Sequence, residues 1–184
     1  MFARFLFQAL LVTTVMPLAL FAADPASATP QLIHISTVNS ELTLFVARDG
    51  RVYQLGFGRA DQEFVVPAKT PNRLEEFHPQ AGDGFICEPA LQATHADGNT
   101  STDLLYAKHD TTAVDTNVTL TRVELKDPAF PFFVTLNFKA YRNEDVIEQW
   151  TEIRHEESGP VTLYRFASSS PLMPKATGYW LTHF

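Results

Sequence analysis

Three pairs of adjacent acidic residues are the main candidates for acid–base chemistry in this sequence. They are Glu75-Glu76, Glu144-Asp145 and Glu156-Glu157. A glycosidase places two carboxyl groups about 5 to 9.5 Å apart on either side of the bond that it cleaves. Each pair falls in a predicted turn or loop, where carboxylates are normally solvated. We therefore expect all three pairs to lie on the surface rather than to form a catalytic dyad.

Other reactive side chains lack the neighbours that their chemistry requires. The serines at 168–170 have no flanking glycines, which a nucleophile elbow needs, so we expect a loop. Cys87 lies in an apolar stretch and is expected to be buried and inert. The six His residues form no H-x-H or H-x-x-x-H pair, and no phosphate-binding glycine loop is present. We expect neither a metal site nor a cofactor.

The composition limits what the chain can bind. Its 184 residues carry 14 basic and 21 acidic side chains, for a net charge of −7, so a patch basic enough for nucleic acid is not expected. With 45% hydrophobic and 19% charged residues, the chain is neither disordered nor a multi-span membrane protein. Its single cysteine permits no internal disulfide.

Residues 1–28 have the pattern of a secretory signal peptide. Arg4 supplies the positive charge, an apolar run follows, and Ala26-Ser27-Ala28 matches a cleavage site. An uncleaved anchor is the alternative, because the run approaches the roughly 20 residues that span a bilayer. Pro17 and the small residues after it favour cleavage. We expect a periplasmic or secreted protein whose folded domain spans residues 29–184.

The rest of the chain predicts antiparallel strands. Asp49-Gly50 separates two apolar segments, 42–47 and 52–55, and predicts a hairpin because Asp-Gly accepts the positive φ of tight turns. Asp97-Gly98 predicts a second hairpin in the same way. Its strands would be residues 90–94 and 100–106.

Residues 132–141 alternate between apolar and polar side chains and predict a strand with one buried face. The change of phase between Leu120 and Val123 predicts a β-bulge. Further strands are predicted at 146–154, 161–167 and 179–184, one helical turn at 73–77, and long loops within 57–89. Short strands separated by turns favour an all-β fold, an antiparallel β-sandwich.

Two groups of aromatic residues could contact sugar, because aromatic rings stack on the apolar faces of pyranoses. Phe57, Phe77 and Phe85 lie in the irregular region, and Tyr179-Trp180 lies near residue 184. Packing in the core is the alternative explanation for each.

Three stretches of the chain, residues 88–109, 146–154 and 159–184, carry a resemblance that covers residues 31–184. In this order they resemble the N-terminal domain of glycoside hydrolase family 36 α-galactosidases, especially exported, Bacteroidetes-type forms. The resemblance implies a supersandwich-like β-domain that precedes a (β/α)8 barrel. That barrel carries the aspartate nucleophile and the aspartate acid/base, and no residue of this chain matches either. We therefore expect no catalytic residue here and a fragment that ends before the barrel.

The resemblance also implies a function and partners. The chain would be the non-catalytic N-terminal domain of a retaining α-galactosidase that acts on terminal α-galactosides. Its partners would be the barrel of the same protein, an α-galactoside bound through that barrel, and other copies in a homo-oligomer. A stand-alone carbohydrate-binding or docking module is the alternative.

Two short segments of the chain resemble family segments near the sugar. Leu55-Gly-Phe-Gly58 resembles a strand end and Gly82-Asp-Gly-Phe85 a loop, which makes Phe57 and Asp83 candidates for a substrate-adjacent position. Turn and packing roles are the alternative for both. Cys87 stands where relatives often have Arg, which weakens the case for that loop.

An apolar face is expected where the sandwich would meet the barrel. The aromatic residues expected on it are Phe130, Phe132, Phe133, Tyr179 and Trp180.

Overall fold

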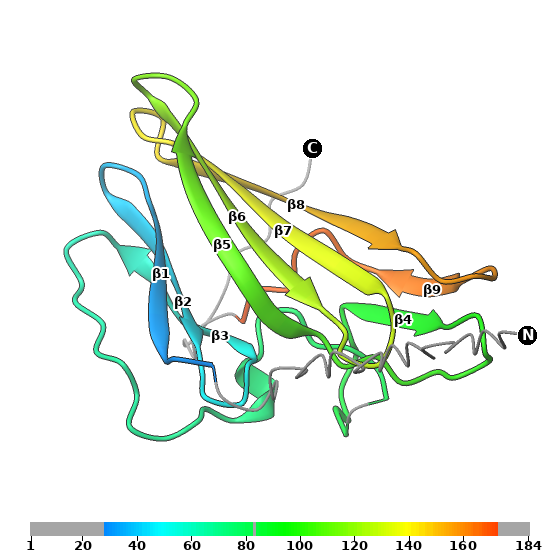
Figure 1. The fold of residues 1–184 in the computed structure, drawn as a ribbon. Coiled ribbons are helices and arrows are strands. Elements are labelled where there is room, and N and C mark those ends of the chain that lie inside the picture. Colours follow the sequence, from blue (N-terminus) through cyan, green and yellow to red (C-terminus); the bar gives the residue numbers. More distant parts are fainter. Residues whose placement is uncertain (1–27, 83, 173–184) are drawn as a thin grey trace, which may run out of the picture.

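The computed structural model describes residues 28–82 and 84–172, which form nine β-strands and one short 3-10 helix (Figure 1). The elements are β1 (Gln31–Ser36), β2 (Ser40–Val46), β3 (Val52–Arg59), η1 (Arg73–Glu75), β4 (Leu91–Thr94), β5 (Leu105–Ala113), β6 (Val118–Lys126), β7 (Phe132–Tyr141), β8 (Val146–His155) and β9 (Thr162–Phe166). The all-β prediction is confirmed. Within these residues no helix is long and apolar enough to cross a membrane. The predicted signal peptide and the predicted strand 179–184 lie outside the described residues, apart from residue 28.

The strands form three antiparallel sheets, ordered β1-β2-β3, β4-β9 and β5-β6-β7-β8. In Figure 1 the four-stranded sheet runs along the molecule, with the three-stranded sheet against one end and the two-stranded sheet toward the other. Buried residues from all three sheets form one apolar cluster. This arrangement is the predicted antiparallel β-sandwich.

The core follows from the alternation of side chains along β7. Every second residue of this strand is buried, as the sequence predicts, because successive side chains of a strand point to opposite faces. The five inward residues are Phe132, Val134, Leu136, Phe138 and Ala140. They pack against inward residues of β1 and β2, including Ile33, Ile35 and Leu44.

The second predicted hairpin is wrong in its pairing. The turn itself forms, since Gly98 has a φ of 88° and His95 N–H donates to the Asn99 carbonyl at 2.8 Å. However, β4 pairs with β9 rather than with residues 100–106. Those residues leave the turn in another direction, because Thr102 N–H bonds to the Ala81 carbonyl and Leu104 is buried in the core.

The predicted bulge is also misplaced. β6 pairs with β7 in an unbroken register, so the change of phase has another cause. Leu120 lies opposite Lys139 on the outer face of the sheet, whereas Thr121 lies opposite Phe138 and takes the buried position. The register shift lies in the neighbouring strand β5, between Tyr106 and Lys108.

Candidate functional site

Phe57 is a predicted site residue that the structure places at a pocket. The pocket has a volume of about 320 Å³ and lies between β3 and β8. The described residues that line it are Leu42, Gln54, Phe57, Phe77, Ile147, Gln149, Ser169, Pro171 and Leu172. Asp83, the other predicted site residue, lies outside the described residues.

A local irregularity of β3 positions Phe57. The register between β2 and β3 shifts at Leu55, and an extra residue in one strand bends it and redirects the side chains that follow. The next residue, Gly56, has no side chain, and a Cβ there would overlap the ring of Phe64. The Phe64 ring therefore packs directly on the β3 backbone. Phe57, one residue further, keeps 53% of its surface exposed.

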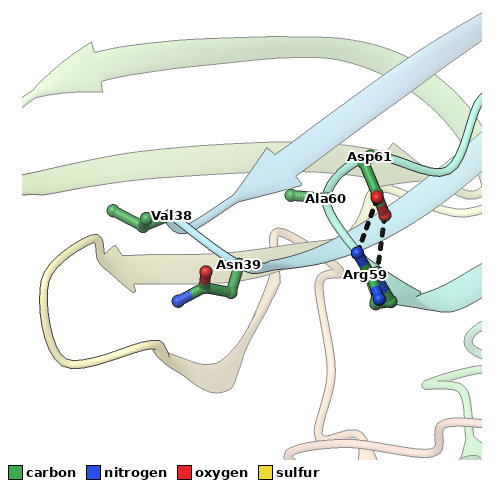
Figure 2. Close-up of a pocket in the computed structure, with 5 residues that line it drawn as sticks. All are labelled: Val38, Asn39, Arg59, Ala60 and Asp61. Carbon is green, nitrogen blue, oxygen red and sulfur yellow. Dashed lines mark hydrogen bonds and ion pairs between the residues drawn. The ribbon is translucent and has the colours of Figure 1, made fainter.

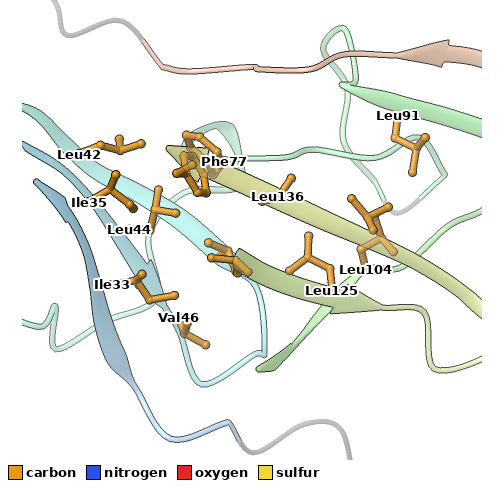
Figure 3. Packing of buried hydrophobic residues seen from close by; sticks show 14 of the residues in the cluster. Ile33, Ile35, Leu42, Leu44, Val46, Phe77, Leu91, Leu104, Leu125 and Leu136 are labelled. Atoms are coloured by element: carbon orange, nitrogen blue, oxygen red, sulfur yellow. The ribbon is translucent and has the colours of Figure 1, made fainter. Parts of the chain in front are cut away.

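The floor of the pocket is apolar and rigid. Phe77 is buried, and its ring centroid lies 5.6 Å from that of Phe138 in a tilted pair. Figure 3 shows Leu42 beside Phe77 at one end of the apolar cluster. Closely packed aromatic and aliphatic side chains hold one another in fixed rotamers, so this floor is preformed.

Two glutamine side chains form the polar wall. The amide of Gln54 donates to the Leu172 carbonyl and accepts from the Leu172 N–H, both at 2.8 Å. Ser169 Oγ donates to Gln149 Oε1 at 2.7 Å. The Nε2 of Gln149 is buried and has no hydrogen-bond partner. The pocket therefore contains one oriented donor that is not used within the described structure.

A larger depression lies just beyond Phe57, where β3 ends at Arg59. It has a volume of about 540 Å³ and is lined by Val38, Asn39, Arg59, Ala60 and Asp61 (Figure 2). The guanidinium of Arg59 donates to both carboxylate oxygens of Asp61, at 3.0 and 2.8 Å. Both charges are exposed and paired, which suits a solvated surface better than catalysis.

The wall of this depression is fixed by Asp145, which has a φ of 58° in the turn between β7 and β8. Its carboxylate accepts hydrogen bonds from the Thr37 hydroxyl and from the side chain and backbone of Asn39. The hydrogen bond from Thr37, followed by those from Asn39, lowers the pKa of Asp145. The ionised carboxylate of Asp145 therefore holds the turn between β7 and β8 against the turn between β1 and β2.

A third pocket, of about 360 Å³, lies on the outer face of the four-stranded sheet and holds two carboxylates. Glu124 of β6 and Glu152 of β8 line it from either side of Thr135. Sequence reasoning missed this pair, because only the strand order brings the two residues together. Glu124 is paired with Lys108 at 3.1 Å, and Glu152 accepts hydrogen bonds from two side chains. Both carboxylates therefore already have partners.

The acidic pair at 75–76 is not solvated as expected. Glu76 is buried and lies within 3.4 Å of Arg51, within 3.1 Å of Arg73 and within 2.6 Å of Gln80. Burial raises the pKa of Glu76, and the two guanidinium groups oppose that rise. With its oxygens held by three side chains inside the fold, Glu76 has a structural role.

The pair at 156–157 is also partly buried. The side chain of Glu157 is only 5% exposed, and it contacts Nδ1 of the buried His95 at 2.8 Å. Its second oxygen accepts from the Ala96 N–H at 2.8 Å. The expectation of a solvated pair is therefore wrong for Glu157, because a turn carboxylate can fold back onto a neighbouring turn. Glu156 is exposed as expected.

Two further expectations are corrected. Cys87 is exposed rather than buried, because the loop around it stays outside the sandwich and leaves Ile86 91% exposed.

The aromatic residues expected on an apolar face lie elsewhere. Phe132 lies in the core, and Phe130 stacks on His95 with the two ring centroids 3.8 Å apart, so neither forms an exposed apolar face. Phe133 is half-buried beneath the guanidinium of Arg154. Tyr179 and Trp180 lie outside the described residues. The serines at 168–170 lie in a loop, as predicted.

Residues 28–82 and 84–172 contain no group of three His, Cys, Asp or Glu side chains that could hold a metal ion.

Comparison with known structures finds a similar fold in part of several solved α-galactosidases. The α-galactosidase of Lactobacillus brevis superposes with a TM-score of 0.62 at 19% identity, over 75% of this chain and 23% of that one. The α-galactosidase AgaB of Geobacillus stearothermophilus gives 0.64 at 20% identity, over 74% and 23%. The galactosidase domain of the α-galactosidase-sucrose kinase AgaSK gives 0.66 at 16% identity, over 75% and 24%. The chain thus spans about a quarter of the length of each.

A search of curated proteins found no match to this chain. The model of the glycosyl hydrolase family 36 N-terminal domain matches residues 46–184, which is most of the chain. The chain therefore belongs to the family of N-terminal domains of glycosyl hydrolase family 36.

Proposed function

We propose that this chain serves as the non-catalytic N-terminal domain of an α-galactosidase that cleaves terminal α-galactosides by a retaining mechanism. The observation that carries the proposal is the match of the family 36 N-terminal domain to residues 46–184. The hydrogen bonding of three carboxylates supports the proposal that this domain is non-catalytic. Glu76, Glu157 and Asp145 are each held by hydrogen bonds within the fold, and a glycosidase needs two free carboxyl groups across a bound sugar.

The partner of this domain would be the catalytic part of the same enzyme. All five residues of β9 are exposed, and Tyr164 and Phe166 keep 66% and 69% of their surfaces accessible. An exposed apolar strand indicates a surface that another domain covers. This chain covers only 23% of each of two solved relatives, so those proteins contain enough additional polypeptide to cover the strand. A homo-oligomer that buries the same strand is the competing assembly.

Hydrolysis of 4-nitrophenyl α-D-galactopyranoside by the purified chain tests the assignment. We expect no release of nitrophenol above the buffer rate between pH 4 and pH 8. Turnover by the purified chain would overturn the proposal. In that event E124Q and E152Q would identify the acids responsible, because these two carboxylates share a pocket.

We also propose that residues 1–28 act as a cleaved leader and that the protein is exported to the periplasm or beyond. The apolar run and the Ala-Ser-Ala site support this proposal. N-terminal sequencing of the protein from the producing cells should begin at residue 29. An N-terminus that still starts at residue 1 would contradict cleavage.

A further inference from the structure

Two segments of the chain match the acceptor pattern for N-linked glycans, in which serine or threonine follows asparagine after one intervening residue. They are Asn99-Thr-Ser101 and Asn117-Val-Thr119. Each has an aspartate two positions before its asparagine, Asp97 or Asp115, and the carboxylate of that aspartate accepts from the asparagine N–H. The two segments are therefore alike in sequence and in local turn, and their contacts with the rest of the fold distinguish them.

Asn99 lies in an exposed part of the connection between β4 and β5 (Figure 1). All six residues from 96 to 101 are exposed, and none of them belongs to a strand. The Oδ1 of Asn99 accepts from the Ser101 N–H at 2.8 Å, which keeps the two residues of the acceptor pattern together. The Nδ2 of Asn99 makes no hydrogen bond within residues 28–82 and 84–172.

The hydroxyl of Ser101 is nearly as accessible as the amide nitrogen of Asn99. It donates one long hydrogen bond, of 3.3 Å, to the Gly82 carbonyl at an exposed position. An enzyme that binds this segment therefore has to break only that bond to reach both groups of the acceptor pattern.

Asn117, in contrast, is held at both ends of its side-chain amide. Its Nδ2 donates to Glu144 Oε2 at 2.6 Å, and its Oδ1 accepts from the Asn143 N–H at 2.9 Å. Thr119, the hydroxyl residue of this segment, lies within β6 and pairs with both β5 and β7. A strand that is paired on both sides opens rarely, so this second segment is closed to an enzyme that must bind it in another conformation.

We propose that Asn99 is a site of N-glycosylation in the folded protein and that Asn117 is not. In this reaction Nδ2 of Asn99 forms a bond to C1 of an oligosaccharide carried on a lipid pyrophosphate. The bond from C1 to the pyrophosphate oxygen breaks, the lipid pyrophosphate leaves with the electron pair, and one amide proton passes to a base of the transferase. The site rests on the proposed export, because such transferases act on polypeptides outside the cytoplasm.

Glycan transfer to the folded whole chain tests the site. The reagents are a purified single-subunit bacterial oligosaccharyltransferase and an undecaprenyl-pyrophosphate oligosaccharide. We expect the intact mass to rise by one glycan and peptide mass spectrometry to place it on Asn99. Asn99→Gln and Ser101→Ala should each abolish the mass increase, because the first removes the nucleophile and the second removes the required hydroxyl. Ser101→Thr keeps a hydroxyl and should still be modified, and Asn117→Gln is the matched control that should behave like the wild type.

An unmodified chain, in a reaction that does glycosylate a standard acceptor peptide, would overturn the site. Modification of Asn117 to the same extent as Asn99 would also overturn it, because the contacts of Asn117 should protect that residue. Either result leaves the proposed function intact, since the assay uses purified chain and depends neither on export nor on α-galactosidase activity. The hydrolysis assay and N-terminal sequencing test those two proposals separately.

Discussion

His95 and Glu157 lie 62 positions apart in the sequence, yet His95 Nδ1 is 2.8 Å from Glu157 Oε1. The first residue follows β4 and the second follows β8, so the contact ties two separate turns together. His95 Nε2 lies 3.1 Å from the hydroxyl of Thr102, and its ring stacks on Phe130. Every polar atom of this buried imidazole ring is therefore used.

The first prediction concerns acid stability. Burial opposes the charge of Glu157, but hydrogen bonds from His95 and Ala96 outweigh it and lower its pKa below the ordinary value of 4.5. The ionised carboxylate therefore stabilises the fold above about pH 4.5, and this contribution is lost as the pH falls through the lowered pKa. Glu157→Gln should lower the free energy of unfolding by about 1–2 kcal/mol at pH 6. It should also make that free energy fall less steeply as the pH decreases from 6 to 3.

Urea denaturation at pH 6 and pH 3 measures both effects. Glu156→Gln is the control, because this neighbouring carboxylate is exposed and pairs with Arg154, whereas His95 contacts Glu157. An identical fall in the free energy of unfolding between pH 6 and pH 3 for the wild type and Glu157→Gln would show that the contact does not stabilise the fold.

The second prediction concerns His78, whose two ring nitrogens are buried without hydrogen-bond partners. Burial lowers the pKa of His78 from 6.5 to about 4. The unfolded chain then binds a proton between pH 6.5 and pH 4 that the folded chain does not bind. Stability should therefore fall over this window as the pH decreases, by about 3 kcal/mol in total.

His78→Leu should remove this pH dependence and should not reduce stability at pH 5, because it replaces an unpaired polar group with an apolar one. His155→Leu, at an exposed position, is the control and should keep the wild-type slope. A chemical-shift titration in which His78 takes up its proton near pH 6.5 would contradict the predicted burial effect.

How far the sequence predicts this fold depends on the distance between interacting residues. The alternation along β7 and the Asp49-Gly50 hairpin are local patterns, and both were predicted correctly. The pairing of β4 with β9 joins Ala93 to Leu163, and nothing within either segment specifies that partner.

The site shows the same limit. Phe57 could be selected as an aromatic residue between two glycines, but the pocket around it requires Gln149 and Leu172 from the other end of the chain. Glu76 and Glu157 were expected at the surface because residue type and turn position favour exposure. Their burial depends on Arg51 and His95, which lie far away in the sequence.

The third prediction concerns Arg51, which is buried between Glu76 and Asp103. Arg51→Met should cost about 3 kcal/mol of unfolding free energy, because it leaves the buried carboxylate of Glu76 with less compensating charge. Arg59→Met is the matched control. Its exposed pair with Asp61 should contribute no more than about 1 kcal/mol. Equal unfolding free energies for the two variants would contradict this assignment.

The fourth prediction concerns β9. If its exposed apolar side chains normally meet another domain, the isolated chain should self-associate through them. The double variant Tyr164→Lys with Phe166→Lys should lower the average mass measured by light scattering. Val65→Lys, which changes a single exposed side chain in a loop, should not. An unchanged average mass in the double variant would show that the chain does not self-associate through β9.

Capture of the native protein from the cells that encode it is the most direct test of the proposal that this chain is part of an α-galactosidase. An antibody raised against this chain should retain a polypeptide much larger than 20.6 kDa, and the captured material should hydrolyse 4-nitrophenyl α-D-galactopyranoside. Capture of a species of 20.6 kDa or less, without α-galactosidase activity, would contradict the assignment.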